Sequence, residues 1–143
     1  DPAFFASAMA SSDFCFVPLG QSDGDSDRYL PALLYGCIPV FATLSEGRPF
    51  EDVLRWEAFS LSVPGGAAGV RSLHALLGRV TDSRLLGMRR AMAAAWPRLL
   101  WTSVHDGERE AAPSPYLGEP PELDAFATLI AVLRRRLRLP VRG

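Results

Sequence analysis

The stretch SSDFCFVPLGQSDGDSDRYLPALLYGCIPVFA, residues 11–42, decides the fold. Residues 13–18 form a continuous apolar run between polar residues and a glycine, a pattern typical of a strand buried on both faces. Residues 38–42 form a second such run, with Pro39 near its beginning, where a missing backbone donor is tolerated. The two runs therefore predict two buried strands.

The segment between these strands predicts a loop and a helix. Residues 21–27 are polar and rich in side chains that hydrogen-bond their own backbone. A helix is expected to start at about Asp27 or Arg28, because Pro31 cannot lie deep in it, and to stop at Gly36. Strand, helix and strand joined by short links predict a right-handed crossover in a parallel sheet. The expected fold class is α/β, a Rossmann-like parallel sheet with flanking helices.

The sequence outside this stretch adds one strand and several helices. Alternation at residues 59–63 predicts a third strand before the Pro64-Gly65-Gly66 turn. Pro97 is expected to break or kink the longest helix. The predicted helices cover residues 2–11, 49–54, about 70–80, 82–101 and 123–137, and Asp82 is the expected N-cap of the helix at 82–101.

Composition describes an ordinary globular domain. The chain has 143 residues, 48% of them hydrophobic, and 15 basic against 16 acidic residues give a formal charge of -1. This balance provides no bulk attraction to nucleic acid or anionic membrane. No apolar stretch approaches the length of a membrane span, and no signal peptide opens the chain. The chain begins abruptly with Asp1-Pro2, so we expect a fragment, with any targeting segment upstream.

The two cysteines, Cys15 and Cys37, lack the spacing of a zinc site or a thiol oxidoreductase. Both lie in apolar runs, which favours buried, unpaired side chains. A mutual disulfide and a reactive thiol are the alternatives.

The loops that follow the first two strands are the candidate binding site. In an open parallel sheet, ligands bind beyond the carboxyl ends of the strands. Ser26 and Arg28 stand at the start of the helix that follows the first loop, where a hydroxyl, a guanidinium and the helix dipole favour a phosphate or diphosphate. Three nearby aspartates at 23, 25 and 27 are expected to face solvent, and an ordinary capped surface loop is the alternative.

The second loop offers Glu46 and Gly47. A carboxylate after the second strand commonly accepts hydrogen bonds from ribose hydroxyls, and a surface glutamate is the alternative. Arg48 could pair with Glu51 or Asp52 on the surface. The Arg-rich end of the last helix, at residues 134–138, is interpreted as a solvated face that complements the helix dipole.

Several of these elements resemble the exostosin family, glycosyltransferase family 47. The resemblance is carried by SSDFCFVPLG, by Ser26-x-Arg28, by GCIPV at 36–40, and by PFEDVLRWEAFS at 49–60, in the family's order. It covers residues 11–63 closely and the rest in general plan. The GCIPV and PFEDVL elements at this spacing are its most specific part.

The resemblance implies that residues 1–143 form a single domain, the C-terminal half of a GT-B fold that binds a nucleotide sugar, expected to be a UDP-sugar. It implies an inverting transfer to a glycan acceptor, with Ser26 and Arg28 on the diphosphate and Glu46 and Gly47 near the ribose position. A missing N-terminal domain would bind the acceptor and provide the catalytic base, so no base is named and the isolated chain is expected to be inactive. No metal or cofactor is expected. The implied location is the lumenal side of the Golgi membrane.

Two other readings stay open. A non-catalytic module would bind the nucleotide sugar without turnover, and a structural interaction domain would bind no nucleotide. The second is favoured by Pro31 and Gly47, which stand where the family often has acidic residues.

Overall fold

The computed structural model describes residues 1–18, 28–42, 47–102 and 123–138. The chain divides into two compact units, one formed by residues 1–47 and 55–94 and the other by residues 48–54 and 95–143. No helix among the described residues combines the length and the apolar character needed to cross a bilayer.

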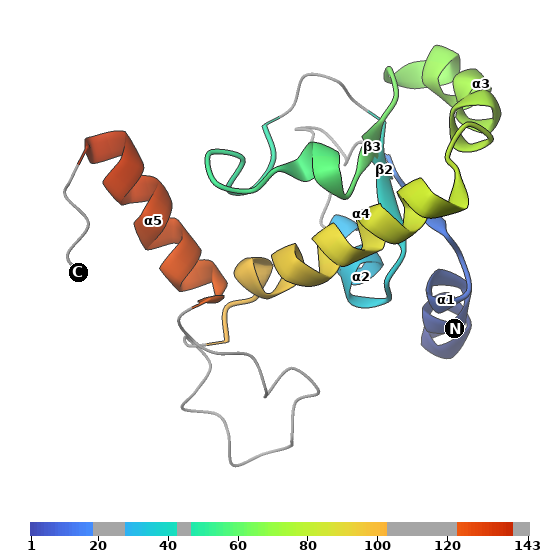
Figure 1. Ribbon diagram of the computed structural model, residues 1–143. Coiled ribbons are helices and arrows are strands. Elements are labelled where there is room, and N and C mark those ends of the chain that lie inside the picture. Colours follow the sequence, from blue (N-terminus) through green and yellow to red (C-terminus); the bar gives the residue numbers. More distant parts are fainter. Residues whose placement is uncertain (19–27, 43–46, 103–122, 139–143) are drawn as a thin grey trace. The chain divides into compact units, whose positions relative to one another are not determined.

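A three-stranded parallel sheet organises the first unit (Figure 1). Its strands are β1 (Phe14–Val17), β2 (Ile38–Phe41) and β3 (Leu61–Ser62), in the order β1-β2-β3. β2 pairs with both neighbours, with Phe14 opposite Ile38 and Val40 opposite Leu61, and all four of its residues are buried. The parallel sheet and its flanking helices confirm the α/β prediction.

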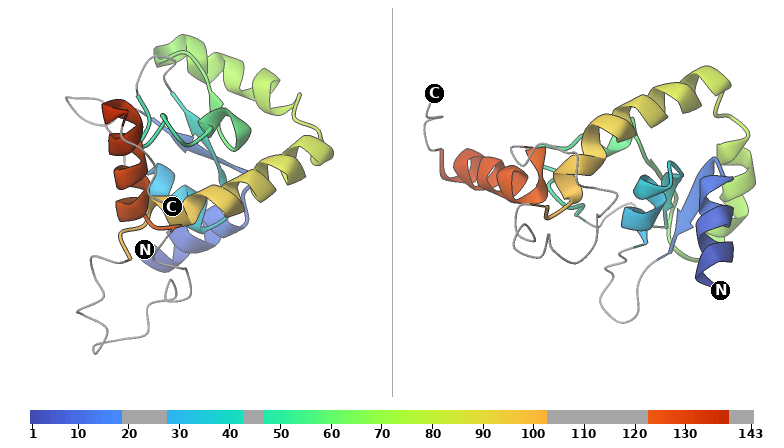
Figure 2. Two further views of the ribbon diagram at one scale, coloured as in Figure 1. Left: turned by 60° about the vertical axis from the view of Figure 1, so that its left-hand side comes forward. Right: turned by 90° about the horizontal axis from the view of Figure 1, so that it is seen from below.

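The first helices and the third strand lie close to their predicted positions. Helix α1 (Pro2–Ala10) is capped by the carboxylate of Asp1, which accepts a hydrogen bond from the backbone N–H of Ala3. Helix α2 (Tyr29–Leu34) ends before Gly36, whose φ of +76° is the left-handed conformation that glycine adopts most readily. A 3-10 turn, η1 (Trp56–Ala58), precedes β3. Figure 2 shows the strands side by side, with α1 at the end where β1 begins.

One prediction about β1 is wrong. Phe16 is 41% exposed, and Phe14 on the same face is only partly buried, whereas Val17 on the opposite face is 3% exposed. Among the described strands β1 has a neighbour on one side only, so it is an edge strand with a single well-buried face. The apolar run correctly predicted a strand but not its environment.

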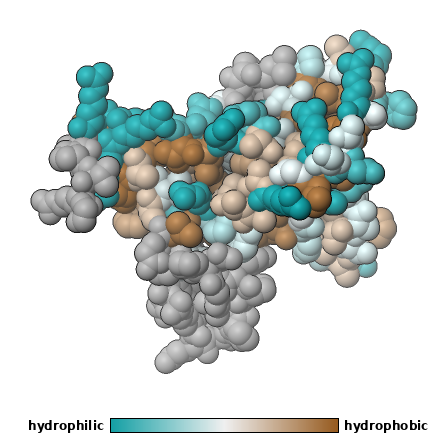
Figure 3. Space-filling view, viewed as in Figure 1, coloured by the Kyte–Doolittle hydropathy of each residue, from teal (hydrophilic) through white to brown (hydrophobic). Residues whose placement is uncertain are grey.

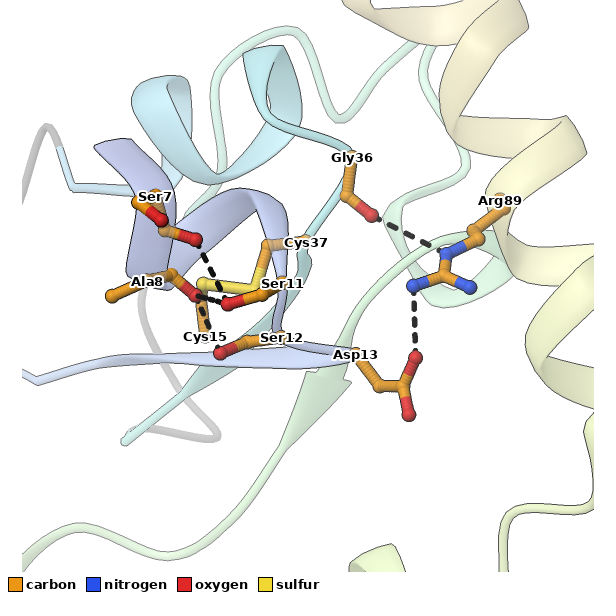
Figure 4. The surroundings of a disulfide bond; sticks show 9 residues. All are labelled: Ser7, Ala8, Ser11, Ser12, Asp13, Cys15, Gly36, Cys37 and Arg89. Carbon is orange, nitrogen blue, oxygen red and sulfur yellow. Dashed lines mark hydrogen bonds and ion pairs between the residues drawn. A yellow bond between two sulfur atoms is a disulfide. The ribbon is translucent and has the colours of Figure 1, made fainter. Parts of the chain in front are cut away.

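The two cysteines form a disulfide, so the prediction of unpaired side chains is wrong (Figure 4). Their Cα atoms are 5.6 Å apart, within the range that a disulfide spans. The parallel register causes this proximity, because it places Cys15 opposite Pro39, two residues beyond Cys37. The bond lies in a small apolar cluster with Met9 of α1 and Ala32 of α2. It therefore joins two strands at the point where two helices pack.

The rest of the first unit is helical. Helix α3 (Gly66–Leu77) follows β3, and helix α4 (Asp82–Ala95) follows after a short turn. The predicted N-cap of α4, Asp82, is its first helical residue, and the hydroxyl of Thr81 accepts the hydrogen bond from the backbone N–H of Arg84. The cap therefore lies one residue earlier than predicted.

Arg89 of α4 anchors that helix to the sheet. Its Nη2 lies 2.8 Å from the Oδ1 of Asp13, and its Nε donates a 3.4 Å hydrogen bond to the carbonyl oxygen of Gly36 (Figure 4). These contacts join α4 to the residue before β1 and to the end of α2.

We expect the Arg89–Asp13 pair to stabilise the fold only slightly. The side chains are 41% and 57% exposed, and exposed ion pairs contribute about 0.2–1 kcal/mol. A double-mutant cycle with Arg89→Met and Asp13→Asn, followed by urea unfolding, would measure the coupling energy directly. A coupling above about 2 kcal/mol would show that the pair is far more shielded from solvent than this exposure indicates.

In the second unit, residues 49–54 form hydrogen-bonded turns rather than the predicted short helix. Phe50 has a φ of +56°, outside the right-handed helical region, so a regular helix cannot pass through it. The backbone N–H groups of Val53 and Leu54 both donate to the carbonyl oxygen of Phe50. The carboxylate of Glu51 accepts a 3.0 Å hydrogen bond from the backbone N–H of Arg48. Glu51 thus binds Arg48 through the backbone.

The remaining elements of this unit agree with the predictions. Pro97 ends α4, and the chain continues as the 3-10 turn η2 (Trp96–Leu99). Helix α5 (Ala125–Leu137) starts at Asp124, whose Oδ1 accepts a hydrogen bond from the N–H of Ala127. The backbone N–H of Ala125 donates to the carbonyl oxygen of Leu100, which joins α5 to the end of η2.

Candidate functional site

The carboxyl ends of the three strands meet at one edge of the sheet, because the strands are parallel. β1 and β2 lead toward the two polar loops singled out from the sequence, and β3 leads into α3. Ligands of open parallel sheets bind at this edge. Of the predicted site residues, the structure describes Arg28 and Gly47, which follow β1 and β2 in the chain.

Arg28 is the predicted site residue that the structure describes best. It occupies the N-cap position of α2 with an exposed side chain, and its carbonyl oxygen accepts a hydrogen bond from the N–H of Ala32. α2 has only six residues, so its dipole is weaker than the sequence analysis assumed. Binding of an anion here would depend mainly on the guanidinium group.

An aromatic cluster fixes the start of α2. The ring of Tyr29, next to Arg28, lies 6.3 Å from that of Phe41 at the end of β2 and 5.5 Å from that of Trp56 in η1. The Trp56 ring is 5.0 Å from that of Phe59, and both side chains are buried. Aromatic pairs at these separations stabilise by about 0.5–1.5 kcal/mol each beyond their buried area. The backbone that carries Arg28 is therefore held against the end of β2.

The second loop is described only from Gly47 onward. Gly47 is exposed, whereas Ser26 and Glu46 lie outside the described residues, as do the three aspartates of the first loop. The predicted roles of Ser26, Glu46 and Gly47 stay predictions. Asp52, a suggested partner of Arg48, accepts a hydrogen bond from the Nη2 of Arg136 at 2.5 Å.

The turn between β3 and α3 is a feature of this edge that the sequence analysis treated only as a turn. Gly66, the first residue of α3, has a φ of +72°, and the N-cap Gly65 provides no side-chain cap. The sequence signal for this feature is a strand followed by two glycines and a helix. This order is typical of a helix N-terminus at the carboxyl edge of a sheet. The first turn of α3 contains no acidic residue.

The described residues of this edge offer a ligand positive charge. Among the described residues no group of three or more His, Cys, Asp or Glu side chains could hold a metal ion. His74 lies exposed on α3, as expected for a helix-surface histidine, and His105 lies outside the described residues. The described part of the edge offers a ligand the exposed guanidinium of Arg28, whose backbone is held by the aromatic cluster.

Comparison with known proteins identifies relatives of the chain. Residues 2–79 match the model of the Exostosin GT47 domain. A probable glycosyltransferase of Arabidopsis thaliana is 47% identical over 55 residues, which are 38% of this chain and 11% of the relative. A probable glucuronosyltransferase of Oryza sativa is 38% identical over 81 residues, which are 57% and 18% of the two chains.

A third relative is named as an exostosin. Exostosin-1a of Danio rerio is 30% identical over 96 residues, which are 62% of this chain and 12% of the relative. The alignments thus span less than a fifth of the length of each of these three relatives.

Proposed function

Because the chain belongs to the exostosin family of glycosyltransferases, family 47, we propose that it forms the nucleotide-sugar-binding half of an enzyme. The enzyme transfers a sugar from a UDP-sugar to a glycan acceptor, with inversion at the anomeric carbon. The observation that carries the proposal is the exposed Arg28 on an anchored backbone at the carboxyl edge of a parallel sheet.

Arg28 would act on the leaving group. When the glycosidic bond to the diphosphate breaks, negative charge develops on the departing UDP. A guanidinium binds such oxygens with two parallel hydrogen bonds and stabilises their charge. Ser26 would add a hydroxyl donor, and Glu46 and Gly47 would lie at the ribose. The described residues supply no assigned catalytic base, which in this proposal comes from the acceptor-binding half.

The proposed whole enzyme has the GT-B fold, in which two Rossmann-like halves face a cleft. The short alignments support the existence of a further half, because each relative named above is far longer than the aligned region. Without the acceptor-binding half, the isolated chain would bind the donor and transfer no sugar.

The proposed location is the lumen of the secretory pathway, at the Golgi membrane. The Cys15–Cys37 disulfide supports it, because disulfides form and persist in oxidising compartments and are rare in the cytosol. Attachment to the membrane would come from a segment other than the described helices.

Calorimetric titration tests the donor site. UDP is expected to bind the purified chain more tightly than ADP, and Arg28→Ala is expected to weaken UDP binding by roughly 10- to 100-fold, the value of a charge-assisted hydrogen bond of about 1.5–3 kcal/mol. Arg90→Ala is the matched control, because Arg90 is also exposed but lies in α4. The control should bind UDP like the unmodified chain.

Two further titrations decide between the readings. UDP-glucuronic acid is included because one relative is named a probable glucuronosyltransferase. If neither UDP nor UDP-glucuronic acid binds the folded chain, the same titrations are made on the full-length protein. If the full-length protein also fails to bind the nucleotides, the result favours a structural interaction domain. If the full-length protein binds UDP but transfers no sugar, the result favours a non-catalytic module.

A further inference from the structure

Helix α5 has a broad apolar face, of which its own unit covers only part. One side is packed within its own unit: Ala125, Thr128 and Val132 are at most 5% exposed. α5 packs against η2, and the backbone N–H of Ala125 donates a hydrogen bond to the carbonyl oxygen of Leu100. A helix that covers a core on one side usually presents polar side chains on the other.

The adjoining side of α5 carries apolar residues that its own unit leaves exposed. Phe126, Leu133 and Leu137 are 48%, 43% and 65% exposed, and Ile130 between them is partly buried. Their spacings of four, three and four residues are those of the seam of a coiled coil. We call these four residues the outer stripe. Figure 3 shows hydrophobic and hydrophilic surface side by side over α5.

The width of the outer stripe favours a helix over a membrane as its ligand. At 3.6 residues per turn, the four side chains lie within about 60° of the helix circumference. A helix that lies on a membrane buries a wider face, whereas two packed helices meet along such a narrow seam.

The charges that α5 itself places beside the outer stripe are all positive. Arg134 and Arg138 are exposed on one side of it, and no acidic residue occurs from Ala125 to Arg138. Arg136, on the other side, has its guanidinium on the carboxylate of Asp52, and Arg135 donates to the carbonyl oxygen of that residue. The Asp52 contacts hold the last turns of α5, so the basic end of the helix is more than a solvated face. A second copy of α5 would bring more arginines and no carboxylates.

We propose that the outer stripe of α5 binds an amphipathic helix of a partner protein, one whose apolar seam is flanked by acidic side chains. Leucine or isoleucine side chains of that helix would pack between Phe126, Ile130, Leu133 and Leu137. Its carboxylates would pair with Arg134 and Arg138. The charges would select the partner, and the apolar seam would provide most of the affinity.

Titration with designed peptides tests this surface. The probe is a helical peptide with leucine at its seam positions and glutamate at the flanking positions, whose own charges oppose self-association. A matched peptide carries lysine at the flanking positions. The chain is expected to bind the glutamate peptide at least about tenfold more tightly than the lysine peptide at low salt. Leu133→Glu should abolish binding, and Ala131→Gln, an exposed and uncharged change outside the stripe, should retain it.

Each other outcome overturns the proposal. If the two peptides bind equally well, the arginines do not select the partner. If neither peptide binds, the outer stripe is not a binding surface for a helix. Concentration-dependent self-association lost in Leu133→Glu would identify a second copy as the occupant. Binding to anionic vesicles but to neither peptide would identify a membrane. Circular dichroism of both variants checks that each is folded.

Discussion

Removal of the Cys15–Cys37 disulfide by the double substitution Cys15→Ala and Cys37→Ala is expected to lower the free energy of unfolding by about 3 kcal/mol. The bond joins residues 22 apart. Closing a loop of this size lowers the conformational entropy of the unfolded chain, which stabilises the folded chain by about that free energy. This loss is a large part of the total free energy of unfolding of a typical domain of this size. Urea unfolding at 25 °C, followed by tryptophan fluorescence, gives the difference.

Reduction of the unmodified chain provides the control. A reductant should lower its unfolding free energy by nearly the same amount and should leave the double variant unchanged. The variant also loses two sulfur atoms from the cluster with Met9 and Ala32, so its loss should be slightly the larger. A variant as stable as the oxidised chain, or one that still responds to reductant, would contradict an entropic role for the bond.

The sequence predicted the sheet well where the signal was local. The residues of β2 form an apolar run whose burial is complete in the structure. The stops at Gly36 and Pro97 were equally local, because each acts through its own backbone geometry. These features need no knowledge of the neighbouring strands.

The errors arose where distant residues decide the outcome. Whether Phe16 is covered depends on which strands and helices flank β1. Whether Cys15 reaches Cys37 depends on the register of β1 against β2, which no sequence spacing reveals. The positive φ of Phe50 is unusual for a bulky residue, and the sequence around it has the form of an ordinary helix start after Pro49.

The candidate site could be predicted only in part for the same reason. The parallel topology, inferred from the order of elements, correctly placed Arg28 at the carboxyl edge of the sheet. The aromatic cluster that fixes its backbone joins residues 29, 41, 56 and 59, and no periodic pattern connects them. Ser26 and Glu46 lie outside the described residues, so their part in the site rests on the family resemblance.

Substitution of Gly69 by alanine is expected to destabilise the chain by about 3 kcal/mol, the upper range for overpacking a rigid site. Gly69 is buried in the first turns of α3. A Cβ on it would overlap the carbonyl oxygen of Pro64 and lie 2.8 Å from the carbonyl carbon. Both are backbone atoms, so no side-chain rotation can relieve the clash. The end of β3 or the start of α3 must move.

Gly87→Ala is the matched control that separates this clash from a general effect of glycine. Gly87 lies in α4, and a Cβ there would meet no atom within 4 Å. Alanine restricts the unfolded chain and favours a helix, so this change should stabilise by up to about 1 kcal/mol. Chemical denaturation of both variants should therefore give changes of opposite sign. If Gly69→Ala is also neutral or stabilising, α3 does not approach Pro64 closely, and the geometry of the turn after β3 must be revised.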